Sequence, residues 1–368
     1  MSKATRILFL NVTRQCNVNC PRCYLSEEVR MKKELLSLDL IDKAVSDPFF
    51  SDPGVDTVVI FEGGELSLIG EKNLRSMLEL VKKKLPNSRT TMVANCYSLP
   101  DWLINICHEY MDSEFETTYA LDKKYSLGGS SDKYQKRFKE NVKKAHDSGI
   151  TLVVNVELNK ETLDLGVDSL MNVIRETNIK CWEFDHSIDF EEFMENPQFN
   201  LYGSPIIRTT TTYEEFSSYI IELAEKHGDE LEKLGIKIGA IQQAIYNEES
   251  VFFNVKNTGN MLSLNADGTC TTDVLYSDIP RMFIGNLKNE TVNEMMKSKS
   301  RKMLLRWENS LRVKDCVGCE FYNKCRGGPS YMPLFDGISN ECAGAKKIWT
   351  YMRDIYDGNY KQKQILSK

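Results

Sequence analysis

The 368-residue sequence has no long hydrophobic run and no excess of positive charge. No stretch approaches the roughly eighteen consecutive apolar residues that a membrane-spanning helix needs. The amino terminus also lacks the charged, apolar and cleavage regions of a secretory signal peptide. We therefore expect a cytoplasmic protein with no membrane partner. Lys and Arg number 47 against 53 Asp and Glu, and this net charge of -6 disfavours a nucleic-acid partner.

The sequence does contain 11 cysteines, which are unevenly distributed. Because no secretion signal is present, metal binding is a more natural use of these thiols than a disulfide framework. Single cysteines in apolar segments, namely Cys96, Cys107 and Cys181, are expected to be small buried side chains. The others include two dense groups, formed by Cys16, Cys20 and Cys23 and by Cys316, Cys319, Cys325 and Cys342.

The amino-terminal group has the spacing Cys16-x-x-x-Cys20-x-x-Cys23 and follows the apolar run at residues 6–12. Three thiolates on one loop can hold three irons of a four-iron, four-sulfur cluster, which leaves the fourth iron without a protein ligand. An open coordination position is typical of reactive rather than structural metal sites. On the triplet alone, a zinc site or unrelated core thiols are the alternatives.

Strand-like and helix-like segments alternate from the amino terminus to about residue 186. The apolar periodicity predicts strands at 5–12, 56–61, 89–95, 115–121, 151–158 and 181–186, and helices at 38–45, 71–85, 101–110, 133–148 and 166–177. Such a series predicts an α/β protein whose parallel sheet closes partly into a (β/α)6, TIM-like barrel. Ligands bind at the carboxyl ends of strands in such sheets, and the cysteine triplet follows the first strand.

The segment Gly63-Gly64-Glu65 follows the second predicted strand. Two glycines let the backbone approach a ligand closely, and a carboxylate can accept hydrogen bonds from an ammonium group. The triplet and this segment together resemble the signature of the radical SAM superfamily. That resemblance implies a [4Fe-4S] cluster on the triplet, with S-adenosylmethionine on the open iron. It also implies reductive cleavage of S-adenosylmethionine to a 5'-deoxyadenosyl radical.

The same resemblance implies further contacts to S-adenosylmethionine near the loop and the strand ends. These positions are Tyr24, Asn95, Asp122, Asn155 and Glu157. Twofold alternation places the last two on one side of their strand. A solvated strand end is the alternative for each of them, and many relatives carry their aromatic residue directly before the third cysteine rather than after it.

No catalytic base can be assigned from the sequence. Polar side chains near the ends of the fourth and sixth predicted strands are candidates for proton transfer, namely Tyr119, Asp122, Glu183, Asp185 and His186. A histidine titrates near neutral pH, but a single one at a strand end is more often only hydrogen-bonded.

The chain beyond residue 186 is expected to contain a loop, a helix and a second domain. Residues 187–211 have little periodicity, which is typical of a lid or a binding loop, and residues 213–234 read as a helix. A hairpin with Asp267-Gly268 at its turn and a short helix follow. We therefore expect a barrel at 1–205, a helical bridge at 206–250 and a small α+β domain at 251–368.

The carboxyl-terminal cysteine group fits either zinc or a second iron–sulfur cluster by its spacing alone. Together with Cys270 and Gly285, it resembles the SPASM/twitch extension of radical SAM enzymes. Glu290 and Pro329 stand where the full pattern has cysteine. The resemblance therefore implies two [4Fe-4S] clusters in all, the second held by Cys316, Cys319, Cys325 and Cys342, with Cys270 a non-ligand thiol.

Radical SAM enzymes with SPASM-type extensions mostly modify peptides or proteins. The resemblance implies oxidative modification of a ribosomally synthesised precursor peptide, by a carbon–carbon (cyclophane-type) or thioether crosslink, with a flavodoxin or ferredoxin as electron donor. Because the chain starts almost at its first strand, a separate leader-binding protein, the barrel rim or the tail is expected to recognise the peptide. The alternatives are a dehydrogenase of a small-molecule alcohol or aminocyclitol, and formylglycine-type modification. A non-catalytic iron–sulfur scaffold is disfavoured by the intact Gly-Gly-Glu segment.

Overall fold

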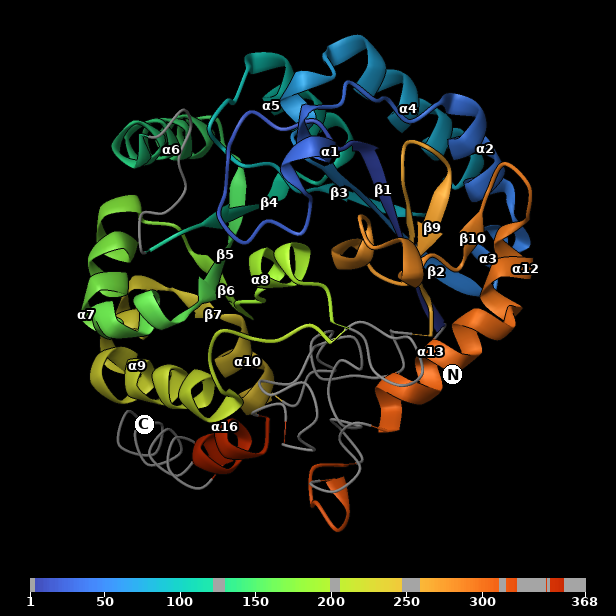
Figure 1. The fold of residues 1–368 in the computed structure, drawn as a ribbon. Coiled ribbons are helices and arrows are strands. Elements are labelled where there is room, and N and C mark those ends of the chain that lie inside the picture. Colours follow the sequence, from blue (N-terminus) through green and yellow to red (C-terminus); the bar gives the residue numbers. More distant parts are fainter. Residues whose placement is uncertain are drawn as a thin grey trace.

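The strands of the protein form two sheets that meet edge to edge. The computed structural model describes residues 4–121, 130–198, 206–246, 259–310, 316–322, 342 and 345–353. The sheets have the strand orders β10-β9-β8-β1-β2-β3 and β4-β5-β6-β7. An isolated parallel bridge between Val93 and Glu116 connects the two edges, so that β1 to β7 follow one another in chain order around a partly closed barrel (Figure 1).

The first six strands are those that the apolar alternation predicted. They are β1 (Ala4–Thr13), β2 (Val55–Gly63), β3 (Arg89–Met92), β4 (Glu114–Tyr119), β5 (Thr151–Leu158) and β6 (Cys181–His186). Their pairings are parallel throughout, which confirms the partial (β/α)6 barrel. A further parallel strand that was not predicted, β7 (Lys237–Ile238), pairs with β6.

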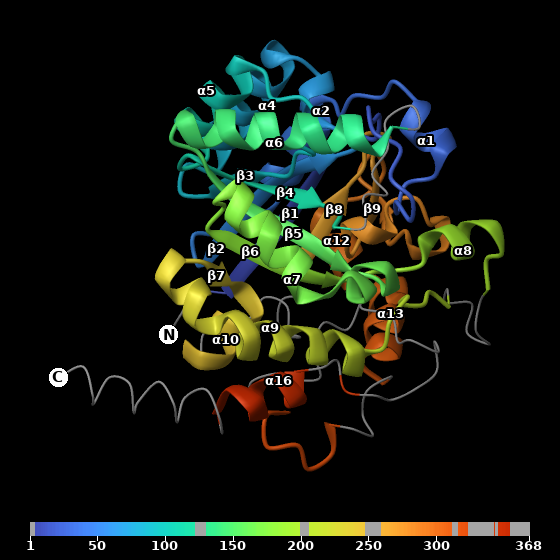
Figure 2. The same ribbon diagram turned by 90° about the vertical axis from the view of Figure 1, so that its left-hand side faces the viewer.

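Helices cover the outer face of these strands, as Figures 1 and 2 show. The long ones are α2 (Leu38–Ser46), α4 (Glu71–Lys84), α5 (Asp101–Tyr110), α6 (Ser131–Asp147), α7 (Lys160–Thr177) and α9 (Tyr213–Leu234). Their positions confirm the predicted helices, except that α7 begins at Lys160 rather than at Gly166. Gly166 has φ +73° and kinks this helix, so only its second part carried a continuous apolar pattern.

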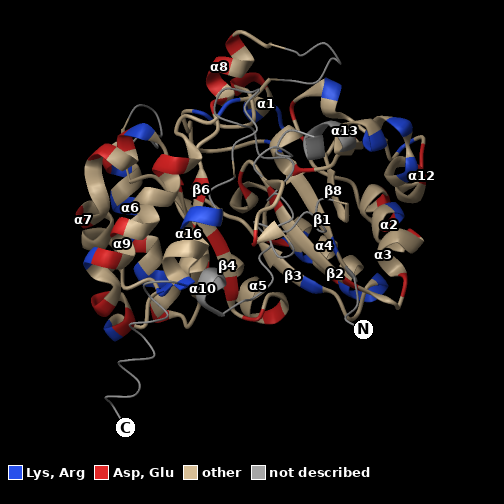
Figure 3. Ribbon diagram, turned by 90° about the horizontal axis from the view of Figure 1, so that it is seen from below, with Lys and Arg blue, Asp and Glu red and all other residues tan. Residues whose placement is uncertain are grey.

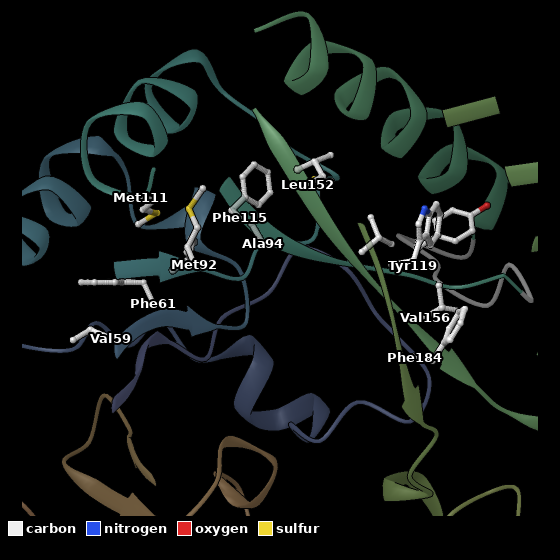
Figure 4. Packing of buried hydrophobic residues seen from close by; sticks show 14 of the residues in the cluster. Val59, Phe61, Met92, Ala94, Met111, Phe115, Tyr119, Leu152, Val156 and Phe184 are labelled. Carbon is white, nitrogen blue, oxygen red and sulfur yellow. The ribbon is translucent and has the colours of Figure 1, made fainter. Parts of the chain in front are cut away.

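Alternate residues of each strand point toward the helices and form the hydrophobic core. Figure 4 shows Phe61, Phe115, Leu152 and Phe184 in this layer between strands and helices. Each fully buried side chain of this size stabilises the fold by about 1.5–3 kcal/mol. The intervening residues of the same strands therefore lie on the inner face of the barrel.

Several short elements connect or follow the long ones. They are α1 (Glu27–Met31), α3 (Pro48–Ser51), the 3-10 helix η1 (Leu66–Leu68), α8 (Phe190–Glu195) and α10 (Gly239–Tyr246). Helix α8 lies within the segment 187–211, which had been expected to be irregular. Figure 2 shows α1 and α8 at the same end of the molecule, toward which the β4 arrow points. None of the described helices is long and apolar enough to cross a membrane.

The predicted hairpin is present, and its first strand extends the barrel sheet. Strand β8 (Met261–Leu264) pairs in parallel with β1, and β9 (Thr269–Thr271) returns antiparallel to it. Strand β10 (Gly285–Asn286) then pairs with β9. Residues 261–286 therefore pack in the same layer as the barrel strands, while the domain boundary near 251 stays a prediction.

The remaining elements are two short 3-10 helices and three α-helices. They are η2 (Val274–Tyr276), η3 (Pro280–Met282), α12 (Val292–Lys297), α13 (Lys299–Ser310) and α16 (Ala345–Tyr351). Thr291 begins α12 with a capping box, in which its hydroxyl and the Glu294 carboxylate each bind a backbone N–H of the other residue. Lys347 of α16 forms an ion pair with Glu214 and donates to Ser218 Oγ at 2.8 Å, which holds α16 against α9.

Candidate functional site

Cys16, Cys20 and Cys23 lie on the loop between β1 and α1, at the carboxyl end of β1. All three are partly buried, and their charges interact. Burial raises the pKa of Cys16 to about 11, although the backbone N–H of Val18 opposes this shift, and burial raises the pKa values of Cys20 and Cys23 as well. Thiolates in such surroundings become favourable when a cationic iron centre neutralises them.

The donor set of this loop fits an iron–sulfur cluster better than a single metal ion. Among the described residues, no group of three or more His, Cys, Asp or Glu side chains is arranged to hold a single metal ion. In a cubane cluster each thiolate binds a different iron, so its ligands surround a larger centre. Three cysteines without a histidine also form the soft donor set that such clusters use.

The Gly63-Gly64 pair lies directly against the start of the cysteine loop. The N–H of Gly64 donates to the Thr13 carbonyl at 2.8 Å, and that of Glu65 to the Gln15 carbonyl at 2.9 Å. A Cβ on Gly63 would lie 1.9 Å from the Thr13 oxygen, and one on Gly64 would lie 2.2 Å from the Gln15 oxygen. The contact of two backbone segments therefore requires both glycines, a reason that the sequence did not reveal.

Glu65 and Asn95 connect the ends of β2 and β3 to the same loop. The buried Glu65 carboxylate accepts hydrogen bonds from the N–H groups of Ser67 and Asn95, each at 2.9 Å. Asn95 Nδ2 donates to Asn17 Oδ1 at 2.8 Å and lies 3.9 Å from Cys16 Sγ. Residues predicted at three successive strand ends thus meet around Cys16. Asn95 lies three residues beyond the last residue of β3, not within the strand.

Tyr24 borders the cysteine loop on the side of α8. Its hydroxyl donates to the Gly63 carbonyl at 3.3 Å, and its ring contacts Phe190 edge-on with 6.5 Å between centroids. Tyr24 therefore joins the loop, the glycine pair and α8.

Asn155 and Glu157 lie on the inner face of β5, where the alternation had placed them. Asn155 Nδ2 donates to Glu116 Oε1 at 2.5 Å. Glu157 accepts a hydrogen bond from Ser187 Oγ at 3.4 Å, and its negative charge raises the pKa values of the Cys20 and Cys23 thiols. Glu157 therefore faces the cysteine loop across the barrel.

Tyr119 and His186 lie on the opposite, helix-covered face of their strands. The Tyr119 hydroxyl donates to Gln135 Oε1 at 2.6 Å, within the packed layer of Figure 4. The His186 ring stacks on Phe216 with 3.9 Å between centroids. The twofold alternation keeps both side chains away from the inner face, so neither is proposed as a catalytic base. Asp122 lies outside the described residues.

Five carboxylates lie on the inner face of the barrel or beside it: Glu62, Glu116, Glu183, Asp185 and Asp273. Burial raises their pKa values, and neighbouring carboxylates raise most of them further, to about 6 for Asp185, about 7 for Glu183 and Asp273, and about 8 for Glu116. The pKa of Glu62 is raised well above its usual range. Glu62, Glu116 and Asp273 were missed from the sequence, although alternation along β2 and β4 contained the signal for the first two.

The carboxyl-terminal cysteine group is only partly described. Cys316 and Cys319 lie in one turn, where the Cys319 N–H donates to the Cys316 carbonyl at 3.2 Å. Cys342 is described without its neighbours, and Cys325 and Pro329 lie outside the described residues. The four-cysteine ligand set therefore stays a prediction.

Cys270 is a buried residue of β9. Its Sγ lies 3.7 Å from the Gly268 carbonyl oxygen, and burial raises its pKa to about 12. Gly285 is its register partner, and the Glu290 carboxylate is close enough to interact with the thiol electrostatically. The positions that resemble inner-cluster ligands thus lie together, but one of them is a glutamate that accepts a hydrogen bond from the Asn286 N–H.

Comparison with solved structures identifies the fold of this chain. No family model matches the chain. An uncharacterised protein of Archaeoglobus fulgidus is 31% identical over 72 residues, which are 20% of this chain and 17% of that protein. A structure of anSMEcpe with bound AdoMet superimposes with a TM-score of 0.72 at 15% identity, covering 97% of this chain and 94% of that one. The chain has the fold of the radical SAM enzymes.

Two further structures share this radical SAM fold. Native anSMEcpe with bound AdoMet and Cp18Cys peptide gives a TM-score of 0.69 at 15% identity, covering 97% and 99% of the two chains. Streptococcus suis SuiB bound to precursor peptide SuiA gives 0.59 at 14% identity, covering 89% of this chain and 72% of SuiB. The fold expected from the cysteine triplet and the strand pattern is therefore confirmed.

Proposed function

We propose that the protein is a radical SAM enzyme whose first [4Fe-4S] cluster is held by Cys16, Cys20 and Cys23. The observation that carries this proposal is the meeting of this loop with the Gly-Gly-Glu segment and with Asn95 at the carboxyl ends of three adjacent parallel strands. When bound, the cluster and S-adenosylmethionine would supply a 5'-deoxyadenosyl radical that removes a hydrogen atom from the substrate.

The protein's own residues would bind and orient S-adenosylmethionine. Two backbone N–H groups fix the Glu65 carboxylate, whose further lone pairs suit an ammonium group. Asn95 is oriented by Asn17, and Tyr24 by the Gly63 carbonyl. We assign the polar groups of Asn155 and Glu157 to the same cofactor, as the resemblance implies.

We propose a ribosomally synthesised precursor peptide as the substrate, oxidised to a carbon–carbon (cyclophane-type) or thioether crosslink. Support comes from the fold that the chain shares with anSMEcpe bound to Cp18Cys peptide and with SuiB bound to precursor peptide SuiA. A second [4Fe-4S] cluster on Cys316, Cys319, Cys325 and Cys342 would accept the electron that the substrate must lose. A flavodoxin or ferredoxin would supply reducing electrons, and a separate protein would bind the leader peptide.

The test is anaerobic incubation of the reconstituted protein with S-adenosylmethionine, dithionite and the short peptide encoded beside its gene. Chromatography measures 5'-deoxyadenosine, and tandem mass spectrometry measures the peptide. We expect a peptide that has lost two hydrogen atoms, with fragment ions missing between the joined residues. Replacing Cys16, Cys20 and Cys23 together by Ala should abolish both products, whereas Cys107→Ala, in the core, is the matched control.

Three outcomes separate the parts of this proposal. Absence of 5'-deoxyadenosine from the reconstituted wild-type protein would reject radical SAM activity. Abundant 5'-deoxyadenosine beside an unchanged peptide would keep that activity and reject this peptide, which would favour a small-molecule substrate. A modified peptide without a fragmentation gap would reject the crosslink alone.

A further inference from the structure

The inner face of the barrel carries a group of carboxylates that we name the acidic inner wall: Glu62, Glu116, Glu183, Asp185 and Asp273. They come from β2, from β4, from β6 and from the residues just after β9. Figure 3 shows acidic positions on β4 and β6, and both acidic and basic positions on the surrounding helices. Glu116, Glu183 and Asp185 are only partly buried, so a bound group can reach them.

No cation balances the acidic inner wall within the described part of the chain. None of its members takes part in an ion pair there. The hydrogen bonds that it receives come from neutral donors, Asn155 Nδ2 to Glu116 and the Leu275 N–H to Asp273. Carboxylates crowded in this way either hold protons or require a cation, because desolvation and mutual repulsion both oppose their charge.

Two neighbouring buried acceptor atoms without hydrogen-bond partners independently indicate a site for a donor group. Asn11 of β1 is the register partner of Glu62 of β2, and the two are 1% and 7% exposed. Asn11 Nδ2 lies 2.9 Å from each of Ser263 Oγ, Asn265 Oδ1 and Ser277 Oγ, and its two hydrogens are shared among these acceptors. Within the described residues, neither Asn11 Oδ1 nor Glu62 Oε1 has a hydrogen-bond partner.

The orientation of the Asn11 amide follows from its neighbours. Asn265 uses its own Nδ2 to donate to the Ser277 carbonyl, so its Oδ1 must accept from Asn11. Asn11 therefore turns Nδ2 toward β8 and leaves Oδ1 free, next to Glu62. A buried acceptor without a partner is unfavourable because it has lost its hydrogen bonds to water, and a ligand that carries only donors would restore such bonds.

We propose that the acidic inner wall binds the ammonium group of a lysine side chain of the substrate, with Asn11 Oδ1 as a further acceptor. This inference rests on the proposed function, because it names a residue of the precursor peptide. The acceptors come from β1, β2, β4, β6 and the segment after β9, so they are not a coplanar pair on one element. An ammonium group has three rotatable donors that suit such a site, whereas the planar guanidinium fork of arginine suits paired, coplanar acceptors.

The acidic inner wall lies close to the cysteine loop that would hold the first cluster. Glu62 immediately precedes Gly63, which contacts the cysteine loop. Asp185 is the register partner of Glu157, whose charge acts on Cys20 and Cys23. A lysine held by the wall would therefore lie on the same inner face as the proposed cofactor site, and would select which segment of the peptide is presented to it.

The experiment compares two peptides on the reconstituted, S-adenosylmethionine-bound protein by anaerobic isothermal titration calorimetry. The probes are acetyl-Gly-Lys-Gly-amide and acetyl-Gly-norleucine-Gly-amide, which differ in the ammonium group. We expect the lysine peptide to bind at least tenfold more tightly. The double variant Glu116→Gln/Asp185→Asn should lose at least tenfold of this affinity, whereas the surface variant Glu79→Gln, with the same kind of charge change, should keep it within twofold.

Several results would overturn the proposal. They are equal binding of the two peptides, binding of neither, tighter binding of the norleucine peptide, or equal losses in the double variant and in Glu79→Gln. Circular dichroism shows whether the double variant folds, and the comparison of peptides on the wild-type protein does not depend on it. Adding dithionite to the same samples after the titration and measuring 5'-deoxyadenosine separates the two proposals. Its presence without lysine preference rejects only the lysine site, whereas its absence rejects the proposed function.

Discussion

Arg14 and Asp267 form an ion pair of 2.9 Å although 253 residues separate them in the chain. Arg14 lies two residues before Cys16 and also binds Glu34 at 2.6 Å, while Asp267 lies in the turn between β8 and β9. At the other end of the cysteine loop, the N–H of Ser26 donates to Asp278 at 2.9 Å. Both ends of the proposed cluster loop are therefore attached to residues 261–286.

Asp267→Ala is expected to weaken the attachment of the cysteine loop. Arg14 keeps Glu34 and Asp267 is partly exposed, so we expect a loss of about 1–2 kcal/mol in the free energy of unfolding. Urea denaturation measures this loss, and iron analysis after anaerobic reconstitution measures cluster retention. Glu225→Ala, an exposed position on α9, is the control. Unchanged stability and iron content in Asp267→Ala would show that the loop holds its shape without the hairpin.

Gly64→Ala is expected to disrupt the site, because its Cβ would lie 2.2 Å from the Gln15 carbonyl oxygen, a backbone atom. The strands must separate to admit the methyl group, which costs about 2 kcal/mol or more. Thermal unfolding and iron content report this change. Gly54→Ala is the matched control, because its Cβ would meet only the flexible Asp52 side chain, at 3.1 Å. Equal effects of the two substitutions would contradict the proposed backbone contact.

The acidic inner wall predicts that stability falls as pH rises. The folded-state pKa values of about 6 for Asp185, 7 for Glu183 and Asp273, and 8 for Glu116 exceed the unfolded values near 4. The folded protein therefore binds more protons than the unfolded chain between about pH 4 and pH 8, so its stability decreases through that window. Glu62, whose pKa is also raised, interacts with Glu116 and Asp273. Two further carboxylates carry charge near the wall: Glu114 acts on Glu116, and Glu157 acts on Cys20.

The double variant Glu116→Gln/Asp185→Asn tests this pH dependence. We expect it to be more stable than the wild type by about 1–2 kcal/mol at pH 8 and to lose that advantage near pH 5. Urea denaturation across this range gives the two curves, with Glu79→Gln as the control. Parallel curves for the variant and the wild type would show that these two carboxyl groups do not titrate abnormally.

Iron content tests the proposed clusters directly. Two [4Fe-4S] clusters require about eight iron atoms per chain. Substituting Cys16, Cys20 and Cys23 should remove half of the iron and abolish S-adenosylmethionine cleavage, because no ligands remain for the first cluster. Substituting Cys316 and Cys319 should remove the other half. Zinc bound by the carboxyl-terminal group, with four irons in the wild-type protein, would contradict the second cluster.

Local features of the site were predictable because they depend on sequence spacing. Two local patterns predicted which residues lie together at the site. They are the spacing of the three cysteines and the position of Gly63, Gly64 and Glu65 directly after a strand. Tyr119 and His186 lie on the helix side of their strands, because nearness to a strand end does not fix which face a side chain occupies. Counting the twofold alternation forward from the apolar Phe115 and Trp182 would have placed both on the helix side.

The sequence by itself determined the order of strands and helices and the cysteine groups, because apolar periodicity and ligand spacing are local properties of the chain. Only the tertiary structure decided which segments distant in the sequence are in contact. The pairing of β8 with β1, the Arg14–Asp267 ion pair and the backbone contact that requires Gly63 and Gly64 join distant segments. The acidic inner wall has the same origin, since strand register and barrel closure bring its carboxylates from separate strands to one face.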